Sequence, residues 1–262
     1  MRETKLVFAD VDGTMLPRYT DEPTPRVVQA VADFFDEGGL LVPTTTRSAD
    51  LMRTPAAMLG LRHLGVLDGG ATIFDFQTGQ RDAEHTRWLS PKHIQEIVSA
   101  IGEFCTEISY EEAYCSHTPA EVAMDAITES APSVFAIFES EREAFIAGTL
   151  ENLGVDGYPN AYEDSETLRC MQIVRVGVNK QTGVQALLEG PYADVRANNI
   201  MVISDNQTDD KLLASMPDGA HKLAMGNAPM SLQECADRVV PHVDSDGFAI
   251  ALEDFMWGRY DV

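Results

Sequence analysis

The sequence has few lysines and a large excess of acidic residues, which limits its partners. Among 262 residues, 19 are Lys or Arg and 42 are Asp or Glu, so the formal net charge is -23 at pH 7. A chain this acidic repels nucleic-acid backbones, and no basic stripe interrupts the pattern. Binding a phosphate group therefore requires local positive charge from a metal ion, a lysine or an arginine. We therefore expect no nucleic-acid partner. An acidic composition is also typical of proteins that work in a high-salt cytoplasm, and this explanation stays open.

Cysteine pairs and long apolar segments are also missing. No C-x-x-C pair is formed by the four cysteines, which are Cys105, Cys115, Cys170 and Cys235. The first ten residues lack the apolar region of a signal peptide, and no apolar run is long enough to span a bilayer. We therefore expect free thiols, a cytoplasmic location and no membrane partner.

The N-terminal third shows the pattern of an α/β sheet. The apolar runs 6–9 and 40–42 read as buried parallel strands, and both end in polar residues. Between them, Thr24 and Pro25 are typical of a helix start, and Gly38 follows the helix end. We expect a further helix from Ser48, kinked or divided at Pro55, then a strand at 65–67 and a hairpin over 71–79.

The middle of the chain changes character, because helices and strands no longer alternate. Helices are expected after Ser90–Pro91 and over 141–153, with strands near 107–110, 133–138, 158 and 171–176. The α/β pattern resumes with a strand at 200–203. We predict an α/β fold: a Rossmann-like three-layer core with a parallel sheet, formed by residues 1–79 and 178–262. An α+β cap with an antiparallel sheet, residues 80–177, is inserted into it.

Acidic and basic side chains follow the predicted core strands. Asp10 and Asp12 lie two residues apart after the first strand, so both point the same way if the chain is extended. Asp205 and Asp209 follow the strand at 200–203, and Lys180 precedes the last α/β segment. If these strands are neighbours, their carboxyl ends bring the side chains to one edge of the sheet.

Crowded carboxylates repel one another, and a hard divalent cation relieves that repulsion. One carboxylate is then free to attack phosphorus, and a second, two residues away, can protonate the leaving oxygen and later activate water. A Mg²⁺ ion and Lys180 would offset the charge of the transferring phosphoryl group.

Four motifs resemble those of the haloacid dehalogenase superfamily in its Cof-type (subfamily IIB) phosphatase form. They cover the chain in order and are Asp10-Val11-Asp12-Gly13-Thr14, Thr44-Thr45-Thr46-Arg47, Lys180, and Ser204-Asp205-Asn206-Gln207-Thr208-Asp209. The sequence departs from the family pattern at three positions. Thr46 and Ser204 each stand where the family has glycine, and Thr208 stands where it has asparagine.

The resemblance implies a role for each matching residue. Asp10 would be the nucleophile and a metal ligand, and Asp12 the acid/base, with its carbonyl on the metal. Asp205 would ligate Mg²⁺, and Asp209 would support the metal site. Thr45 and Lys180 would bind the phosphate. Because the second motif holds three threonines, Thr44 and Thr46 stay open as alternatives to Thr45.

The expected function is Mg²⁺-dependent hydrolysis of a small phosphomonoester, such as a sugar phosphate, through an aspartyl-phosphate. Two alternatives remain open: a phosphomutase of the same superfamily, and a catalytically inactive domain that binds a phosphorylated ligand as a sensor. The sequence identifies neither the phosphorylated metabolite nor the oligomeric state.

Overall fold

The structure is a computed structural model that describes residues 3–18, 20–110, 122, 124–161 and 165–260. Its centre is a five-stranded sheet with the order β12-β11-β10-β1-β2, in which every neighbouring pair is parallel. The strands are β1 (Leu6–Ala9), β2 (Leu40–Pro43), β10 (Ile200–Ser204), β11 (His221–Ala224) and β12 (Arg238–Val239). The parallel sheet expected from the buried apolar runs is confirmed.

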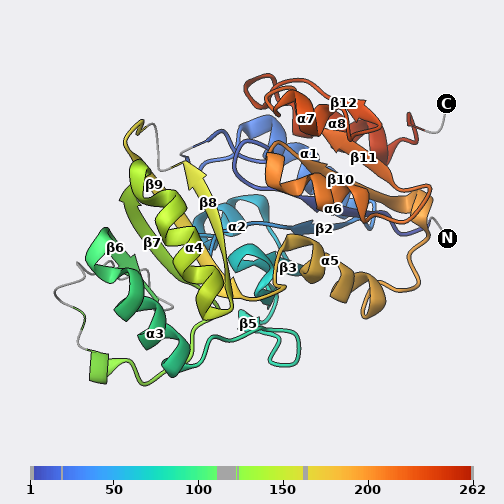
Figure 1. The fold of residues 1–262 in the computed structure, drawn as a ribbon. Helices are drawn as coiled ribbons and strands as arrows, with labels where there is room; N and C mark the ends of the chain where they lie inside the picture. Colours follow the sequence, from blue (N-terminus) through green and yellow to red (C-terminus); the bar gives the residue numbers. More distant parts are fainter. Residues whose placement is uncertain (1–2, 19, 111–121, 123, 162–164, 261–262) are drawn as a thin grey trace.

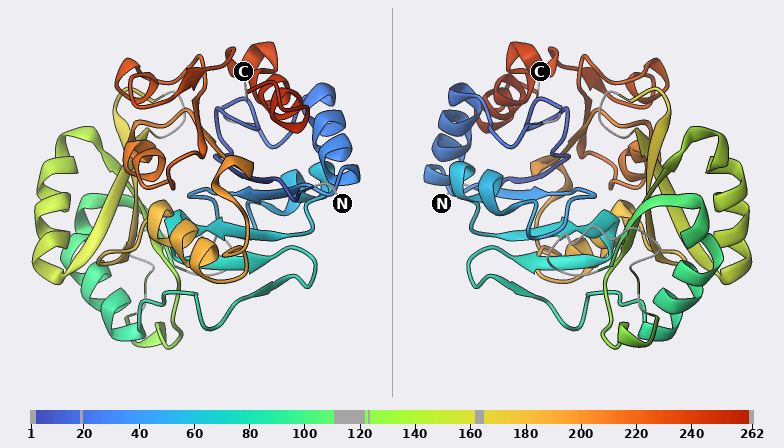
Figure 2. Two further views of the ribbon diagram at one scale, coloured as in Figure 1. Left: turned by 90° about the vertical axis from the view of Figure 1, so that its right-hand side faces the viewer. Right: turned by 90° about the vertical axis from the view of Figure 1, so that its left-hand side faces the viewer.

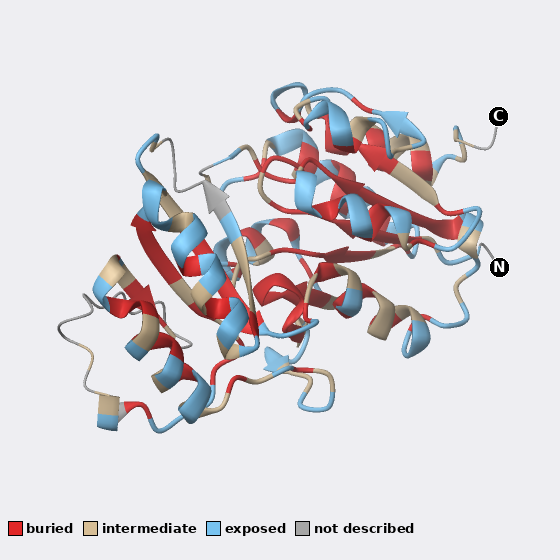
Figure 3. Cartoon of the chain, in the orientation of Figure 1, coloured by how far each residue is buried: buried red, intermediate tan, exposed pale blue. Residues whose placement is uncertain are grey.

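Helices cover both faces of this sheet. Successive side chains of a strand point to opposite faces, and because β1 and β2 are apolar throughout, both faces need covering. Val7 and Ala9 pack toward one face, whereas Leu6 and Phe8 pack toward the other. The first face carries α1 (Pro25–Asp36), α2 (Arg53–Leu59) and α8 (Gly247–Met256). The second carries α5 (Lys180–Glu189), α6 (Asp210–Ala214) and α7 (Met230–Gln233). The result is a three-layer α/β core whose central strands are buried (Figure 2, Figure 3).

The ends of α1 and α2 follow from local chemistry. The Thr24 hydroxyl accepts a hydrogen bond from the Val27 amide, and Pro25 occupies the first helical position, as expected. The helix expected from Ser48 was placed too early, because α2 begins at Arg53. Pro55 therefore lies in the first turn, where backbone N–H groups have no partner within the helix, and it neither kinks nor ends α2.

A small antiparallel sheet extends the core beside β2. It contains β3 (Leu64–Leu67), β4 (Thr72–Asp75) and β5 (Gln80–Arg81) in that order. Thr44 forms a parallel bridge with Val66, which joins this sheet to the end of β2. A 3₁₀ turn at Asp68–Gly70 links β3 to β4.

The middle of the chain forms a second layered unit, which we call the antiparallel unit. Its sheet has the order β6-β7-β9-β8 and contains β6 (Cys105–Ser109), β7 (Val134–Glu139), β8 (Val155–Ala161) and β9 (Leu168–Arg175). α3 (Pro91–Ile101) and α4 (Glu143–Leu153) pack on this sheet around a separate apolar core. The antiparallel α+β insert expected from the sequence is confirmed (Figure 1).

The cysteines of the described ranges form no disulfide: Cys105 and Cys170 are buried, and Cys235 is exposed. Cys115 lies outside the described residues. Within those residues, no helix combines the length and apolar character needed to cross a bilayer.

Candidate active site

The predicted site residues gather at the carboxyl edge of the parallel sheet. Asp10 follows β1 and its amide donates to the Ile203 carbonyl, so it is tied to β10. Thr44 follows β2 and donates its amide to Ala9. Asp205 directly follows β10. Parallel strands in register therefore bring residues almost 200 positions apart in the sequence to one edge.

Lys180 links two of the carboxylates. Its Nζ lies 2.9 Å from Asp10 Oδ1 and 2.9 Å from Asp209 Oδ2, and all three side chains are less than a tenth exposed. Lys180 is the first residue of α5, whose start packs against the turn after β3. Gly70 makes this close approach possible: it has φ +104°, and a Cβ there would lie 1.9 Å from the Asn179 carbonyl oxygen.

Only one oxygen of Asp10 is committed. Oδ1 accepts hydrogen bonds from Lys180 Nζ and from the Val11 amide at 2.8 Å. Oδ2 makes no hydrogen bond within the described part of the chain, and the side chain keeps 7% exposure. Asp10 thus presents one anchored oxygen and one free oxygen.

Charge at this buried edge is unbalanced. The pKa of Asp10 is raised to about 8: burial raises it most, the Lys180 ammonium lowers it, and the Asp209 and Asp205 carboxylates raise it further. Burial acts to lower the pKa of Lys180, but the carboxylates of Asp10 and Asp209 raise it above its ordinary value. Asp10 and Asp209 therefore share one buried ammonium, and Asp205 is paired with the half-exposed Arg18. Three buried carboxylates beside two cationic groups leave an excess of negative charge that favours a further cation.

Asp205 is fully buried and is held from several sides. Thr14 Oγ1 donates to Oδ1 at 3.2 Å, and Asn227 Nδ2 donates to Oδ2 at 3.1 Å. Arg18 Nη2 lies 2.7 Å from Oδ2, although half of the Arg18 side chain is exposed. Gly13 packs directly on this carboxylate, because a Cβ at Gly13 would lie 2.2 Å from Oδ2.

The Asp12 carboxylate is bound by Arg47. Arg47 Nε donates to Oδ2 at 2.9 Å, and Nη2 donates to Oδ1 at 2.7 Å, so the pair is bidentate. Arg47 also donates to Asp21 and to the Thr20 carbonyl. The arginine that ends the second motif therefore fixes the orientation of Asp12 in this structure.

The three threonines of the second motif differ in what their hydroxyls do. Thr44 Oγ1 donates to the Val42 carbonyl and is committed to its own strand. Thr45 Oγ1 accepts from the Arg47 amide at 3.1 Å, which leaves its proton available to a ligand. Thr46 lines the pocket described below.

Two departures from the family pattern have local roles. Ser204 donates from Oγ to Asp209 Oδ2 at 2.6 Å and accepts from the Asn206 amide. Its hydroxyl thus helps Lys180 to hold Asp209. Thr208 is exposed, and its hydroxyl bonds to the Asn206 side chain rather than to the buried carboxylates.

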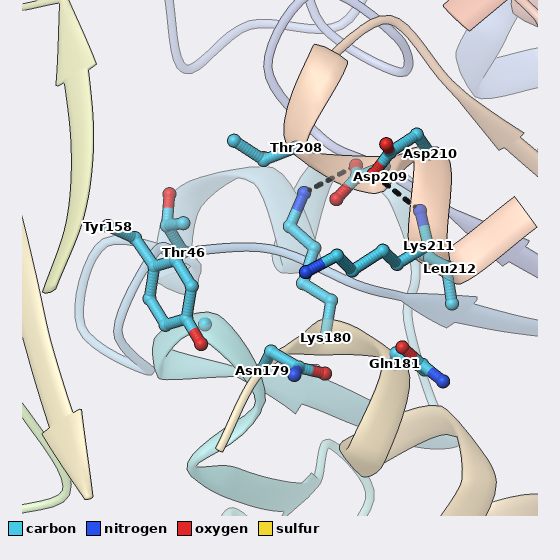
Figure 4. A pocket seen from close by; sticks show the side chains of 11 residues that line it. Thr46, Tyr158, Asn179, Lys180, Gln181, Thr208, Asp209, Asp210, Lys211 and Leu212 are labelled. Carbon is cyan, nitrogen blue, oxygen red and sulfur yellow. Dashed lines mark hydrogen bonds and ion pairs between the residues drawn. The ribbon is translucent and has the colours of Figure 1, made fainter. Parts of the chain in front are cut away.

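A pocket of about 220 Å³ opens beside Lys180 and Asp209 (Figure 4). Thr46 and Gly69 line it from the core, and Tyr158 lines it from β8 of the antiparallel unit. The Tyr158 hydroxyl donates to the Val178 carbonyl at 2.7 Å. Both layered units therefore contribute walls to the pocket.

Gln172 of β9 joins the antiparallel unit to the second motif. Its Nε2 donates to the Thr46 carbonyl at 2.9 Å and to Ser133 Oγ at 3.3 Å. The side chain is 2% exposed, and its buried Oε1 has no hydrogen-bond partner within the described ranges. This oxygen faces Gly69, where an added Cβ would lie only 2.7 Å away.

The residues at the sheet edge fit a magnesium ion. Mg²⁺ is bound by one or two carboxylates together with waters and substrate phosphate rather than by a cage of protein ligands. Asp10 and Asp205 supply such carboxylates, and the charge of Asp205 acts on Asp10. Among the described residues no group of three or more His, Cys, Asp or Glu is arranged around a common metal position. In this structure Asp12 and Asp205 are each paired with an arginine.

Several site residues were not identified from the sequence. Arg18 and Asn227 contact Asp205, and Gln172 and Tyr158 reach the site from the antiparallel unit. Asn227 lies shortly after the end of β11, so its place at a strand end was a usable signal. The other three had no such signal, because their contacts depend on how distant segments pack.

Comparison with known proteins gives one family for most of the chain. The sequence model of a family described as haloacid dehalogenase-like hydrolase matches residues 7–252. A Haemophilus influenzae protein named "Putative phosphatase" is 24% identical over 269 residues, covering 95% of this chain and 97% of that protein. A Bacillus subtilis protein with a similar phosphatase name is 21% identical, covering 96% of this chain and 98% of that protein.

Solved structures show the same fold. A phosphatase of the haloalkanoate (HAD) enzyme superfamily from Bacteroides thetaiotaomicron superimposes with a TM-score of 0.74 at 20% identity, covering 97% of this chain and 95% of that one. A sugar phosphatase of HAD subclass IIB gives a TM-score of 0.72 at 16% identity, covering 96% and 98%.

Proposed function

Since the chain belongs to the haloacid dehalogenase-like hydrolase family, we propose that it is a phosphatase of the Cof-type branch that hydrolyses a small phosphomonoester with Mg²⁺ through an aspartyl-phosphate on Asp10. The substrate class is a sugar phosphate or a related metabolite. The observation that carries this proposal is the free Oδ2 of Asp10, whose other oxygen is anchored by Lys180 and the Val11 amide.

Asp10 and Asp205 would hold the metal with the main-chain carbonyl of Asp12, and Asp209 would support it through Lys180. The ion would shield the negative charge of the phosphoryl group and of the attacking carboxylate. Arg18 contacts Asp205 with a half-exposed side chain, so it could move into solvent when a metal ion takes its place as the partner of this buried carboxylate.

The chain's own residues account for two chemical steps. In the first, Asp12 is protonated and released from its ion pair with Arg47. Asp10 Oδ2 then forms a bond to phosphorus while the bond from phosphorus to the leaving oxygen breaks, and Asp12 gives its proton to that oxygen. In the second, Asp12 takes a proton from water, the water oxygen bonds to phosphorus, and the bond to Asp10 breaks. Inorganic phosphate leaves, and both carboxyl groups return to their starting states.

Lys180 and Thr45 would bind the phosphoryl oxygens during both steps. Lys180 already bridges Asp10 and Asp209, so its ammonium stays beside the nucleophile as charge develops. Residues 80–177 would form the cap that selects the leaving group, because Tyr158 lies in the pocket wall and Gln172 contacts the second motif.

The test is hydrolysis of an aryl phosphate by the purified protein. Activity should disappear with EDTA and return with Mg²⁺, and Asp10→Asn should abolish it because an amide cannot form the acyl phosphate. Full activity after exhaustive metal removal would contradict the metal proposal. Phosphoryl transfer to a sugar without release of phosphate would indicate a mutase, and binding of phosphate without turnover would indicate a sensor.

A further inference from the structure

The pocket beside Lys180 contains a second ammonium group. Lys211, the second residue of α6, lines this pocket. The sequence has only five lysines among 262 residues, and two of them, Lys180 and Lys211, lie in this one pocket. Lys180 is used by the proposed chemistry, whereas Lys211 is not.

Lys211 differs from Lys180 in its partners. Lys180 is buried between two carboxylates. Lys211 is exposed, and within the described residues its Nζ makes neither an ion pair nor a hydrogen bond. An unpaired ammonium is unexpected in a chain with a net charge of -23, where carboxylates outnumber cationic groups about twofold.

Neither neighbouring carboxylate of the pocket, Asp209 or Asp210, contacts the Lys211 ammonium. Asp209 accepts from Lys180 and Ser204, and Asp210 Oδ1 accepts from the backbone amide of Lys211 at 2.6 Å. Figure 4 shows the Lys211 side chain extending away from Asp210, across the pocket toward the wall that contains Asn179 and Tyr158. Its charge is therefore directed into the space that a leaving group would occupy.

The remaining polar groups of the pocket are neutral. The Tyr158 hydroxyl is bound to the Val178 carbonyl, and the Asn179 side chain caps α5 by accepting from Thr182. Within the described ranges, the side chains of Thr46 and Gln181 make no hydrogen bond, so they can bind hydroxyl groups of a ligand. Lys211 is thus a cationic group in this pocket that forms no ion pair with a carboxylate of the described residues.

We propose that Lys211 binds a second anionic group on the substrate, so that the preferred substrates are phosphomonoesters whose leaving group carries a carboxylate or another phosphate. This inference rests on the proposed phosphatase function and specifies its substrate class. Lys180 receives the transferring phosphoryl group, and Lys211 receives the anion at the other end of the molecule. A sugar phosphate of equal size whose leaving group is uncharged would leave the Lys211 ammonium without a partner.

The experiment measures how strongly matched phosphomonoesters inhibit the hydrolysis of an aryl phosphate in the presence of Mg²⁺. One pair is glycerol 3-phosphate and 3-phosphoglycerate, which differ in a carboxylate. The other is fructose 6-phosphate and fructose 1,6-bisphosphate, which differ in a phosphate. The wild-type protein should bind the more anionic member of at least one pair about tenfold more tightly, the lower end of what a charged hydrogen bond contributes. The responsive pair identifies which anion Lys211 accepts.

The variants assign this preference to one side chain. Lys211→Met, which keeps the length and removes the charge, should abolish the tenfold preference without changing the competition by the less anionic member. Lys211→Arg should keep most of it. Lys92→Met is the matched control, because Lys92 is 82% exposed on α3 and pairs with Glu96. It should behave as the wild-type protein.

Each other outcome overturns the inference. A wild-type protein without preference in either pair, or a Lys211→Met protein that keeps the preference, contradicts the role of Lys211. Equal weakening of all four competitors by Lys211→Met would indicate a general effect on phosphate binding instead. Absence of aryl phosphate hydrolysis would contradict the proposed function alone, and calorimetric binding of the same four compounds would then still test Lys211.

Discussion

Replacing Gly13 by alanine should damage the proposed metal site through a single methyl group. Gly13 has φ +79°, and a methyl group added there would lie 2.2 Å from Asp205 Oδ2 and 2.7 Å from Cγ. Ordinary van der Waals contact begins near 3.4 Å, so the carboxylate must move by 3.4 − 2.2 = 1.2 Å. Asp205 is fully buried and cannot move this far while it keeps its hydrogen bonds to Thr14 and Asn227.

Two separate losses are expected from Gly13→Ala. A left-handed backbone costs a non-glycine residue about 1–2 kcal/mol of folding free energy. Each hydrogen bond lost by Asp205 adds roughly 1 kcal/mol, so the free energy of unfolding should fall by about 2–4 kcal/mol in total. Because a metal ligand must lie within a few tenths of an ångström of its position, the Mg²⁺ concentration for half-maximal activity should rise at least about tenfold.

Gly79→Ala separates these two losses. Gly79 has a similar φ of +69°, but no heavy atom lies within 4 Å of the position that a methyl group would take there. This variant should lose only the backbone contribution of about 1–2 kcal/mol and keep its Mg²⁺ dependence. Urea unfolding measures the first quantity, and a Mg²⁺ titration of aryl phosphate hydrolysis measures the second. If both variants required the same Mg²⁺ concentration as the wild-type protein, the placement of Asp205 as a metal ligand would be refuted.

Asp12→Asn should keep the fold and phosphate binding but slow turnover by about 10²–10⁴-fold, because the amide cannot transfer the proton; wild-type rates would exclude this role. Lys180→Met leaves Asp10 and Asp209 buried without their shared cation, so it should lower the free energy of unfolding by about 3–5 kcal/mol in urea titrations, and a smaller loss than Lys92→Met would contradict the pairing. Burial raises the pKa of Cys105 to about 12, so iodoacetamide at pH 8 should modify exposed Cys235 before Cys105, as peptide mass spectrometry would show.

The sequence was sufficient for features that depend on local pattern. Continuous apolar runs identified β1, β2 and β10, and the Thr24–Pro25 pair located the start of α1, because strand burial and helix capping act over a few residues. The same reasoning failed at α2. Pro55 was interpreted as a break, but the first turn of a helix tolerates proline, and nothing local distinguished these positions.

Features that depend on packing between distant segments could not be predicted. The sequence placed Asp12 and Arg47 in separate motifs, yet their bidentate pair forms only because β1 and β2 are neighbours. The contact of Arg18 with Asp205 joins residues 187 positions apart. From the sequence, Ser204 was only a residue that replaces the glycine of the family pattern. Its hydrogen bond to Asp209 depends on the folded structure and could not be predicted.

The buried amide oxygen of Gln172 affects how firmly the antiparallel unit is held to the core. In the packed arrangement, Gln172 gains a hydrogen bond to the Thr46 carbonyl, but Oε1 stays beside Gly69 without a donor from the described residues. A buried, unsatisfied polar group costs about 1–3 kcal/mol, which is comparable to what the hydrogen bond contributes. If the two units separated, water would solvate both ends of the amide and the Thr46 carbonyl. Gln172 therefore helps to determine how the antiparallel unit is oriented against the core. It adds almost nothing to the free energy that holds the two units together.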